Sequence, residues 1–529
     1  WARENIQIFI NFFEIQNPSE LILPATLIFS LTVTLSALLR LLNLWLNTFV
    51  AAGISSEIST DAYRKTLYQD YKYHLNSNTS KTIAASTSQS LAIYIIIGSV
   101  LTLLAYCFIA LSIYVTLILI SWQMAIIASL VFISAYFALA KLLQPKISHN
   151  SNLVADLSEK QIKIMQEGLG AVRDILLDSN QEMYVKFYKD TDLLMRIRNA
   201  QNSFFSSFPR HAFEALGLVF IAVIAFISSR KGISSTESII ILGVFALGAQ
   251  RLLPALQQIY GSWALIKSYS GPAEKILQLL RLKVPIENVP SSRKYNFKKS
   301  IKLQNISFKY DYGKNFVIQN FNMEILKGNK IGFIGQTGSG KSTLIDIIIG
   351  LLKPTSGNLL IDDKSLYGNK LNNKDFLSKW KSNIAYVPQN IYLSDSTFKQ
   401  NIAFGIEDKN IDMKLVKKSA KIAQISTFIE KMPYSYDSYI GERGVRLSGG
   451  QRQRIGIARA IYKQVNILVL DEATSALDNK TEKLIIDQIS KFKSEITVLM
   501  IAHRLSTLNI CDYIYEIDSN SLKLRTDLK

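Results

Sequence analysis

The chain has 529 residues, enough for two domains, and 48% of them are hydrophobic although 19% are charged. The net charge is +19, and the apolar residues are concentrated in the first half of the chain. This combination argues against a nucleic-acid-binding protein and favours an integral membrane protein whose cytoplasmic flanks are rich in Lys and Arg. The two cysteines, Cys107 and Cys511, lie in different parts of the sequence and give no disulfide framework or zinc site.

Apolar stretches long enough to cross a bilayer, which takes about 20 residues, recur in the first half of the chain. Their approximate positions are 21–52, 90–120, 123–144, 207–229 and 235–262. Ser121 and Trp122 provide the only turn-like break between the second and third stretches, so the loop there must be very short. The sequence therefore predicts a helical transmembrane domain with five spans within residues 1–282.

Lysine and arginine residues indicate which connections between these stretches lie in the cytosol. The long connections 53–89 and 145–206 carry many of them, whereas the connection at 121–122 carries none. The last short connection carries only Arg230 and Lys231. The positive-inside rule places both long connections in the cytosol. The N-terminus is then outside, and the segment that follows the last span is in the cytosol.

Charged residues inside the apolar stretches cost roughly 2.5–3.5 kcal/mol each on the insertion scale and are candidates for function. These residues are Arg40, Arg210, Glu214 and Arg251. Arg210 and Glu214 are spaced to pair on one helix face, and Arg40 can extend to the membrane surface. Arg251 lies roughly 24 Å into the last stretch at the helical rise, without an acidic partner nearby in sequence. Three arginines in a membrane cavity suit an anionic, phosphate-bearing substrate, because a guanidinium binds phosphate bidentately.

Two prolines, two serines and mixed charge mark a linker at about 283–297, and a second domain follows at 298–529. In this domain, residues 335–342 read GQTGSGKS and fit the phosphate-binding loop G-x-x-x-x-G-K-[ST]. A hydrophobic strand at 331–334 precedes the loop and a helix-like run at 343–350 follows it, which is the context that the motif requires. The sequence therefore predicts a nucleotide-binding α/β domain.

Each part of this loop has a chemical reason. Small residues let the backbone N–H groups wrap the phosphates, and the helix start adds the positive end of its dipole. Lys341 can reach the β- and γ-phosphates, and the hydroxyl of Ser342 can reach Mg²⁺. The residues expected to contact the nucleotide here are Gly335, Gln336, Thr337, Gly338, Ser339, Gly340, Lys341, Ser342 and Thr343.

A second motif, LSGGQ at 447–451, indicates which kind of nucleotide-binding protein this is. Together with GQTGSGKS it resembles the ATP-binding cassette (ABC) family. The resemblance implies ATP as the nucleotide and an α/β P-loop ATPase domain with a helical subdomain, which we expect at 392–460. The serine of LSGGQ should begin a helix.

The resemblance also implies roles for four further residues. Asp471 and Glu472 end the apolar run 467–470 and look like the Walker B motif. Asp471 would hold the Mg²⁺ shell, and Glu472 would act as general base on the attacking water. Gln389 in YVPQ fits the Q-loop, which contacts the metal and the membrane domain, and His503 in IAHRLS fits the switch histidine. A lone histidine is more often structural, but His503 stands within its motif.

Further ATP contacts are implied for Tyr310 in ISFKY, which would stack on adenine, and for Asp478 at the end of the D-loop SALD. For Tyr310, ordinary packing at a strand end is the alternative. In this family the LSGGQ motif of one cassette completes the ATP site of another. The residues expected to act in this way are Ser448, Gly449, Gly450 and Gln451. Because the chain holds one cassette, it should form a dimer, and we expect a homodimer.

Exporter-type ABC half-transporters have six spans, with the N-terminus inside. Five spans and a start at Trp1 therefore imply that the first span precedes this sequence, and residues 1–20 would be an external segment with a short interfacial helix. The family's coupling helices should fall near 69–80 and 169–186, although a solvated amphipathic hairpin is the alternative reading. The segment IGERG at 440–444 resembles the X-loop of exporter cassettes, which importers lack, and it favours export.

The segments FPRHAFEALG (208–217) and ALGAQRLLPALQQ (246–258) resemble the lipid-linked oligosaccharide flippases of bacterial glycosylation. Arginines at matching positions in that group are associated with the lipid pyrophosphate, which implies that Arg40, Arg210 and Arg251 bind substrate. We therefore expect an ATP-driven exporter or flippase of a lipid-linked oligosaccharide or other anionic lipid in the bacterial inner membrane, with ATP and Mg²⁺ as cofactors and the cassette in the cytosol.

The sequence allows three alternative functions. An exporter of peptides, proteins or drugs is the close alternative, and a peptide-processing version should carry an N-terminal Cys/His peptidase domain, which this sequence does not contain. A soluble ABC ATPase of nucleic-acid repair or translation is disfavoured by the spans. An inactive regulatory ABC protein is disfavoured by the intact catalytic motifs.

Overall fold

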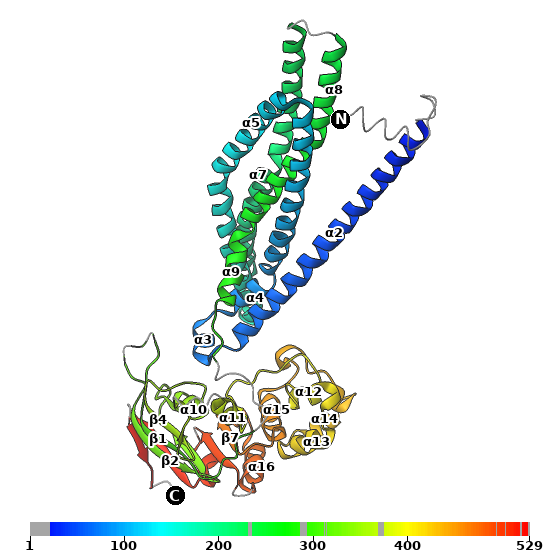
Figure 1. Cartoon of the computed structure of the whole chain (residues 1–529). Coiled ribbons are helices and arrows are strands. Elements are labelled where there is room, and N and C mark those ends of the chain that lie inside the picture. The colour runs from blue at the N-terminus through cyan, green and yellow to red at the C-terminus, as the bar shows by residue number, and fades with distance from the viewer. Residues whose placement is uncertain are drawn as a thin grey trace. The chain divides into compact units, whose positions relative to one another are not determined.

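The computed structural model describes residues 22–230, 235–285, 294–311, 313, 315–368, 375–492, 495–502, 504–518 and 521–526. The chain divides into a helical unit and a second unit, which we call the cassette. The helical unit comprises Trp1–Leu67 and Ser77–Lys283. The cassette comprises Val284–Lys529 together with the short segment Tyr68–Asn76 from the first half of the chain. Figure 1 shows long helices in the helical unit and sheets covered by short helices in the cassette.

Long helices account for the apolar half of the sequence. They are α2 (Ile22–Leu67), α5 (Ser90–Gly170), α7 (Gln181–Arg230) and α8 (Ser235–Ser268). The unit also contains the short helices α4 (Thr79–Ser86), α6 (Val172–Leu177) and α9 (Ser270–Leu280). The predicted spans fall within α2, α5, α7 and α8, and each of these helices continues into polar sequence. Among the described residues, two stretches, Ile22–Leu67 and Thr79–Leu119, are long and apolar enough to cross a membrane. The interfacial helix expected within residues 1–20 lies outside the described residues.

Helix α5 has helical backbone along its whole length, but the chain reverses its direction within it. The side-chain amide of Gln89 donates to the carbonyl oxygen of Ala155, 66 residues further along the chain, at 3.2 Å. A straight helix would separate these residues by roughly 100 Å. The chain must therefore reverse about halfway between them, close to residue 122. This is where the sequence predicts a very short loop, at Ser121 and Trp122.

Aromatic and polar contacts hold α5, α7 and α8 side by side. The ring of Tyr136 on α5 stacks on Phe213 of α7 with centroids 3.9 Å apart, and Tyr260 of α8 lies 5.7 Å from the same tyrosine. Towards the polar ends of the helices, Asn150 Nδ2 donates to Asn202 Oδ1 at 3.2 Å. Buried amides must be paired, so this contact fixes the register of α5 against α7.

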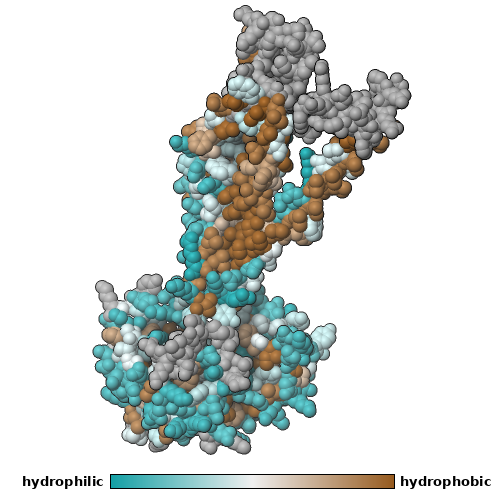
Figure 2. Space-filling model, viewed as in Figure 1, coloured by the Kyte–Doolittle hydropathy of each residue, from teal (hydrophilic) through white to brown (hydrophobic). Residues whose placement is uncertain are grey.

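Helix α2 packs on the rest of the helical unit through only part of its length. Ala62 is fully buried against Ala92 of α5 and Ile276 of α9. The first half of the helix is apolar but exposed, with 70% of the surface of Phe29 open, and Figure 2 shows this hydrophobic surface along α2. An apolar surface of this extent is stable only when lipid or another protein chain covers it.

Two sheets form the framework of the cassette. The four-stranded antiparallel sheet has the order β2-β1-β4-β5, with β1 (Ser300–Phe308), β2 (Ile318–Leu326), β4 (Ser356–Ile361) and β5 (Lys364–Ser365). The six-stranded sheet has the order β10-β9-β3-β8-β7-β6, with β3 (Lys330–Ile334), β6 (Ile384–Val387), β7 (Ile467–Asp471), β8 (Thr497–Ile501), β9 (Tyr513–Asp518) and β10 (Ser521–Leu524). All of its pairings are parallel except β9 with β10. Continuous apolar runs such as β7 form these strands because helices and the other sheet bury both faces.

The helices of the cassette are short. They are α3 (Tyr71–Asn76), α10 (Lys341–Ile348), α11 (Phe376–Lys381), α12 (Phe398–Ile402), α13 (Met413–Ile422), α14 (Ser426–Glu430), α15 (Gly449–Tyr462) and α16 (Asn479–Ser490), with 3₁₀ turns η4 (Asp408–Asn410), η5 (Ser435–Asp437), η6 (Glu442–Gly444) and η7 (Leu505–Ile510). Helices α12 to α15 fall in the region predicted to be the helical subdomain. The separate hydrophobic core beneath them includes Phe398, Ile429 and Ile455.

The start of the cassette differs from the sequence-based boundary. The linker was expected to extend to residue 297, but Phe297 is fully buried and meets Trp380 edge-on, with ring centroids 5.7 Å apart. Tyr295 packs in the same manner on Phe376 at 4.9 Å. The polar and proline-rich composition that suggested a linker therefore ends before these two aromatic residues, which belong to the core of the cassette.

Candidate functional site: the nucleotide site of the cassette

The predicted catalytic segments meet at one edge of the six-stranded sheet. The phosphate-binding loop follows β3, the pair Asp471 and Glu472 ends β7, and Gln389 follows β6. These strands are parallel and neighbouring, in the order β3-β8-β7-β6, so their carboxyl ends lie together. Crevices at this edge are where open α/β sheets bind ligands. His503 follows the end of β8, but the residue itself lies outside those that the structure describes.

The phosphate-binding loop uses glycine where no other residue fits. Gly335 has φ of +145°, and a Cβ there would lie 2.3 Å from the carbonyl oxygen of Ile517 in β9. Gly340 has φ of +99° and directly precedes α10. The left-handed region costs little for glycine alone. The loop can therefore pack tightly on β9 and turn directly into the helix, leaving the N-terminal N–H groups of α10 available to an anion.

Lys341 is held within the loop. Its ammonium group donates to the carbonyl oxygens of Gly335 and Gln336, both at 2.7 Å. Burial lowers the pKa of Lys341, while the nearby charges of Glu472 and Asp471 act in the opposite direction. The hydroxyl of Ser339 is buried, and it has no hydrogen-bond partner among the described residues. A phosphate oxygen would supply such a partner, so the loop fits the group that the motif predicts.

Asp471 lies at the end of β7 and is 6% exposed. Tyr386 of β6 donates its hydroxyl hydrogen to Asp471 Oδ2 at 2.9 Å, and the hydroxyl of Ser342 also bonds to this carboxylate. Burial raises the pKa of Asp471, and both hydroxyl groups partly oppose that effect. Burial, together with the nearby charge of Asp471, raises the pKa of Asp346 on α10 to about 6.

The oxygen atoms of Ser342 and Asp471 suit Mg²⁺, a hard cation that takes one or two protein ligands and completes its shell with phosphate and water. In the described part of the chain, no group of three or more His, Cys, Asp or Glu residues could form an all-protein metal site.

Glu472 has an unusual backbone conformation, with φ of +49°. Its amide N–H donates to the carbonyl oxygen of Ile501 in β8 at 3.0 Å. The side-chain amide of Gln389 donates to Glu472 Oε2 at 2.7 Å. The structure thus brings the Q-loop residue and the Walker B glutamate into direct contact, although they are 83 residues apart in sequence.

Tyr310 lies at the end of β1 and contacts the loop from the side. Its hydroxyl is 3.2 Å from that of Thr343 on α10, and its ring meets Phe308 edge-on at 4.9 Å. Burial raises the pKa of Tyr71 on α3, and the nearby groups of Asp346 and Tyr310 act in the same direction. The packing role considered for Tyr310 is therefore present, and stacking on adenine remains a prediction.

The signature motif begins a helix, as the sequence predicts. Ser448 is the N-cap of α15: its hydroxyl accepts from the N–H of Gln451, whose side chain accepts in return from the N–H of Ser448. This reciprocal capping box leaves Gly449 and Gly450 in the first turn, and Ser448 itself is exposed. An exposed helix start suits an anion that approaches from outside the chain.

Asp478 caps α16 and accepts from the N–H and the hydroxyl of Thr481 at 2.9 and 2.8 Å. These bonds lower the pKa of Asp478. Of the residues predicted to contact ATP, Asp478 thus has a structural role within its own chain, and a contact to ATP remains a prediction. Thr337 and Gly338 form the turn of the loop, where Gly338 has φ of +84°.

The arginines predicted to bind substrate have different surroundings. Arg210 Nε lies 3.3 Å from Glu214 Oε1, so the pairing that the sequence left open is present. Arg40 is exposed on α2. The backbone of Arg251 lies in α8, and its side chain is outside the described part of the structure.

Four polar residues near the site were not found from the sequence: Tyr386, Asp346, Gln453 and Glu482. Gln453 donates to the hydroxyl of Ser475 at 3.0 Å, and Glu482 accepts from Thr474 at 2.8 Å. No motif marked them. The only available signal was a polar residue within an otherwise apolar run, as for Tyr386 in β6.

Comparisons with known proteins agree with this fold. The transmembrane region of ABC transporters matches residues 5–253, and the ABC transporter domain matches residues 318–475. The fold is similar to that of a bacterial Atm1-family ABC exporter with ATP bound, with a TM-score of 0.82 over 98% of this chain and 89% of the other, at 20% identity. The fold and site define a membrane protein with an ATP-binding cassette. The chain belongs to the ABC transporters and has the exporter architecture, with both domains fused in one polypeptide.

Two curated relatives are similar to this chain over most of its length. The heterocyst differentiation ATP-binding protein HepA of Nostoc sp. is 31% identical over 77% of this chain and 65% of its own length. The ATP-dependent lipid A-core flippase of Pectobacterium atrosepticum is 26% identical over 84% of this chain and 73% of its own. The chain spans less than two thirds of the length of the first curated relatives that it matches.

Proposed function

We propose that this chain forms a homodimer in the bacterial inner membrane that hydrolyses ATP to move an anionic, lipid-linked substrate outward. The observation that carries the ATPase part is the convergence of five side chains at one sheet edge. They are Lys341, Ser342, Gln389, Asp471 and Glu472. Each has the chemical type that phosphoryl transfer to water requires at its position.

Each of these residues has its own role in ATP hydrolysis. The loop N–H groups and Lys341 hold the phosphates, and Ser342 and Asp471 would hold Mg²⁺, which neutralises charge that develops on the phosphate oxygens. Glu472 accepts a proton from the attacking water as general base. Gln389, which bonds to Glu472 at 2.7 Å, orients that carboxylate.

The dimer follows from the exposed signature helix. In one chain, the start of α15 is capped by Ser448 and open to solvent, so it can meet the phosphates of an ATP bound to the partner. Two cassettes facing each other would then share two ATP molecules, one held between each loop and the opposite signature helix. The exposed apolar half of α2 is consistent with a membrane domain that is completed by lipid and a second copy.

The first coupling segment lies on the cassette. Helix α3 belongs to the cassette unit, and Lys72 Nζ lies 2.6 Å from Asp311 Oδ1, immediately after Tyr310. The polar connection between two membrane helices is thereby attached next to the nucleotide site. Closure of the cassettes around ATP can move the helices that α3 joins.

The second coupling segment presents a complementary surface. Helix α6 exposes Leu176 and Leu177 at the tip of its hairpin, with 74% of Leu177 open, and Asp174 and Asp178 flank them. On the cassette, a groove of about 400 Å³ beside β6 and α15 is apolar at Ile391 and Phe404 and carries three cations.

Those cations are Lys381, Arg459 and Lys463. Arg459 lies 4.5 Å over the ring of Phe404, and burial lowers its pKa to about 10. Burial and the charge of Arg459 also lower the pKa of Lys463. A partner with carboxylates would be electrostatically complementary to these three like charges. We infer that this groove receives the α6 tip of the other copy, leucines inward and aspartates towards the cations.

The proposal for the cargo rests on the membrane arginines. Arg251 lies deep in a span, and its insertion cost implies a compensating role. Arg210 is neutralised by Glu214, so Arg251 is the principal candidate for a phosphate ligand. Among the relatives are flippases of lipid A-core, which supports a lipid cargo. A lipid-linked oligosaccharide is the particular cargo we propose, and a peptide, protein or drug is the alternative.

The ATPase part is tested by changing the base. Glu472→Gln keeps the shape of the side chain and its contact to Gln389 but removes the proton acceptor. Steady-state hydrolysis by the purified chain should fall by roughly 10²–10⁴-fold, the usual contribution of a general base, while ATP binding persists and the dimer is trapped closed. Turnover of the variant within about threefold of the unmodified protein would refute the role of Glu472, because the expected loss is at least about 10²-fold.

A further inference from the structure

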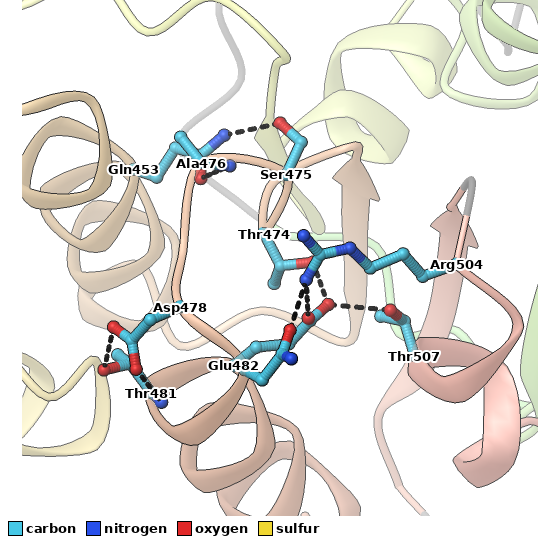
Figure 3. A network of polar contacts seen from close by, with 10 residues as sticks. Gln453, Thr474, Ser475, Ala476, Asp478, Thr481, Glu482, Arg504 and Thr507 are labelled. Carbon is cyan, nitrogen blue, oxygen red and sulfur yellow. Dashed lines mark hydrogen bonds and ion pairs between the residues drawn. The ribbon is translucent and has the colours of Figure 1, made fainter.

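The turn that carries Glu472 is strained and must be held in place. Glu472 adopts a left-handed backbone conformation, with φ of +49°. Side-chain-bearing residues disfavour this region, and they persist in it only where their surroundings fix them. The residues that fix this turn therefore determine where the carboxylate of Glu472 lies. Two buried polar side chains meet the turn from opposite sides, Gln453 and Glu482 (Figure 3).

Gln453 lies on the signature helix α15 and uses both ends of its side-chain amide. Its Nε2 donates to Ser475 Oγ at 3.0 Å and to the carbonyl oxygen of Glu472 at 3.4 Å. Its Oε1 accepts from the N–H of Ala476 at 2.9 Å. Gln453 thus bonds to the backbone of Glu472 itself. Gly450, one turn earlier on α15, allows this approach, since a Cβ there would lie 3.0 Å from the carbonyl oxygen of Ala476.

Glu482 lies on α16 and is 6% exposed. Its Oε1 accepts from the hydroxyls of Thr474 at 2.8 Å and Thr507 at 2.7 Å, and its Oε2 accepts from Arg504 Nη1 at 2.9 Å. Figure 3 shows all three side chains directed at this one carboxylate. A buried carboxylate is tolerated only when its oxygens are paired in this manner.

These contacts join three segments. Thr474 is two residues beyond Glu472, whereas Arg504 and Thr507 follow β8, the strand that pairs with β7 and ends at the same edge of the sheet. The carboxylate of Glu482 therefore fixes the turn after β7 relative to the segment after β8. Gln453 fixes the same turn relative to the signature helix.

We propose that Gln453 and Glu482 are positioning residues for ATP hydrolysis, which hold the strained turn so that the carboxylate of Glu472 meets the attacking water. The proposal rests on the role given above to Glu472. Among the residues that the structure describes, neither side chain is hydrogen-bonded to the nucleotide loop, so both act through Glu472 and leave ATP binding largely unaffected.

Two isosteric substitutions test this in the full-length protein. Gln453→Glu removes the N–H donor to Ser475 and sets a carboxylate oxygen against the carbonyl oxygen of Glu472. Glu482→Gln sets an amide against Arg504. Each should lower kcat for ATP hydrolysis by about tenfold or more, because a misplacement of about 1 Å costs up to roughly 10²-fold. The KM for ATP and the binding of a fluorescent ATP analogue should change by less than about threefold, since the loop is untouched.

A matched control tests whether the loss of any other Glu–Arg ion pair in the cassette would lower kcat in the same way. Glu516→Gln breaks another Glu–Arg pair of the same cassette, in which Glu516 Oε2 lies 2.6 Å from Arg525 Nη1. It should leave kcat unchanged. If Glu482→Gln fails to fold, Arg504→Ala tests the same carboxylate from a residue whose side chain is half exposed.

The decisive measurement combines each substitution with Glu472→Gln in single-turnover assays. If Gln453 and Glu482 act through Glu472, adding either change should lower the residual rate by less than about twofold, because coupled residues are not additive. A further tenfold loss in that background, or unchanged kcat in the single variants, would overturn the proposal. Full turnover by Glu472→Gln alone would instead refute the role of Glu472 as base.

Discussion

Asp346→Asn should stabilise the cassette at neutral pH. Asp346 lies half-buried on α10, and burial together with the charge of Asp471 raises its pKa from 3.8 to about 6. The native state therefore binds a proton more readily than the unfolded chain between about pH 4 and 6, so this carboxyl lowers stability progressively as pH rises through that window. Above about pH 6 the full penalty is present.

The magnitude follows from the shift in pKa. A difference of about 2 pKa units corresponds to about 3 kcal/mol, and we expect about 2 kcal/mol after allowance for the solvent that still screens the carboxyl. For a domain of this size, each 1 kcal/mol changes Tm by roughly 2–4 °C. Asp346→Asn should therefore raise Tm at pH 7.5 by about 4–8 °C, and the advantage should fall by about half near pH 5.

Thermal unfolding of the full-length protein without nucleotide, followed by intrinsic fluorescence between pH 4.5 and 8, measures this effect. Asp363→Asn is the control of opposite sign. Lys302 lowers the pKa of Asp363, so its removal should weaken the cassette slightly at neutral pH and not at low pH. An Asp346→Asn variant with no gain in Tm at pH 7.5, or with a gain that does not shrink on acidification, would refute the electrostatic reasoning.

Three further outcomes are expected. When a Lys341→Ala chain is mixed with a Ser448→Arg chain, the heterodimer should keep one intact composite site and occlude nucleotide there. Nucleotide occlusion no better than in either mutant alone would argue against ATP sites that are shared between two chains. Arg251→Ala should leave basal ATPase activity largely intact yet impair flipping of a pyrophosphate-linked lipid. Arg251→Lys should restore flipping only partly, because an ammonium lacks the planar fork of a guanidinium. Full flipping by the alanine variant would contradict a substrate-binding role for Arg251. Leu177→Asp should uncouple ATPase activity from transport, and substrate-stimulated ATPase activity equal to that of the unmodified protein would contradict docking of α6.

The catalytic loop and the strand ends were predictable because their signals are contiguous. GQTGSGKS sits between a strand and a helix, and LSGGQ caps α15 through Ser448 and Gln451 as helix-capping rules require. The short reversal near residue 122 was equally local, since only two residues interrupt a long apolar run. In each case neighbouring residues determine the conformation.

The contacts that sequence reasoning missed join distant residues. Tyr386 and Asp471 are 85 residues apart and meet only because β6 and β7 are paired. Glu482 depends in the same way on the turns after β7 and β8. For Arg210, the sequence allowed both a cavity ligand and a pair with Glu214, and only the rotamers in the folded chain show the pair.

Two aromatic residues at the end of the predicted linker pack on the cassette for a similar reason. Pro and Ser content describes local chain preference, but Phe297 is buried by Trp380, far along the sequence. Tertiary burial therefore extends the domain into a segment whose composition resembles a linker.

We propose that ATP hydrolysis at this site drives outward movement of an anionic lipid-linked substrate. The most direct test of this proposal is reconstitution of the protein in liposomes that contain a fluorescent polyprenyl-pyrophosphate-linked sugar, with translocation scored by a membrane-impermeant quencher. We predict movement that requires ATP and Mg²⁺ and that Glu472→Gln abolishes although the variant still binds ATP. Absence of ATP-dependent movement by the unmodified protein, or equal movement by the variant, would contradict the account.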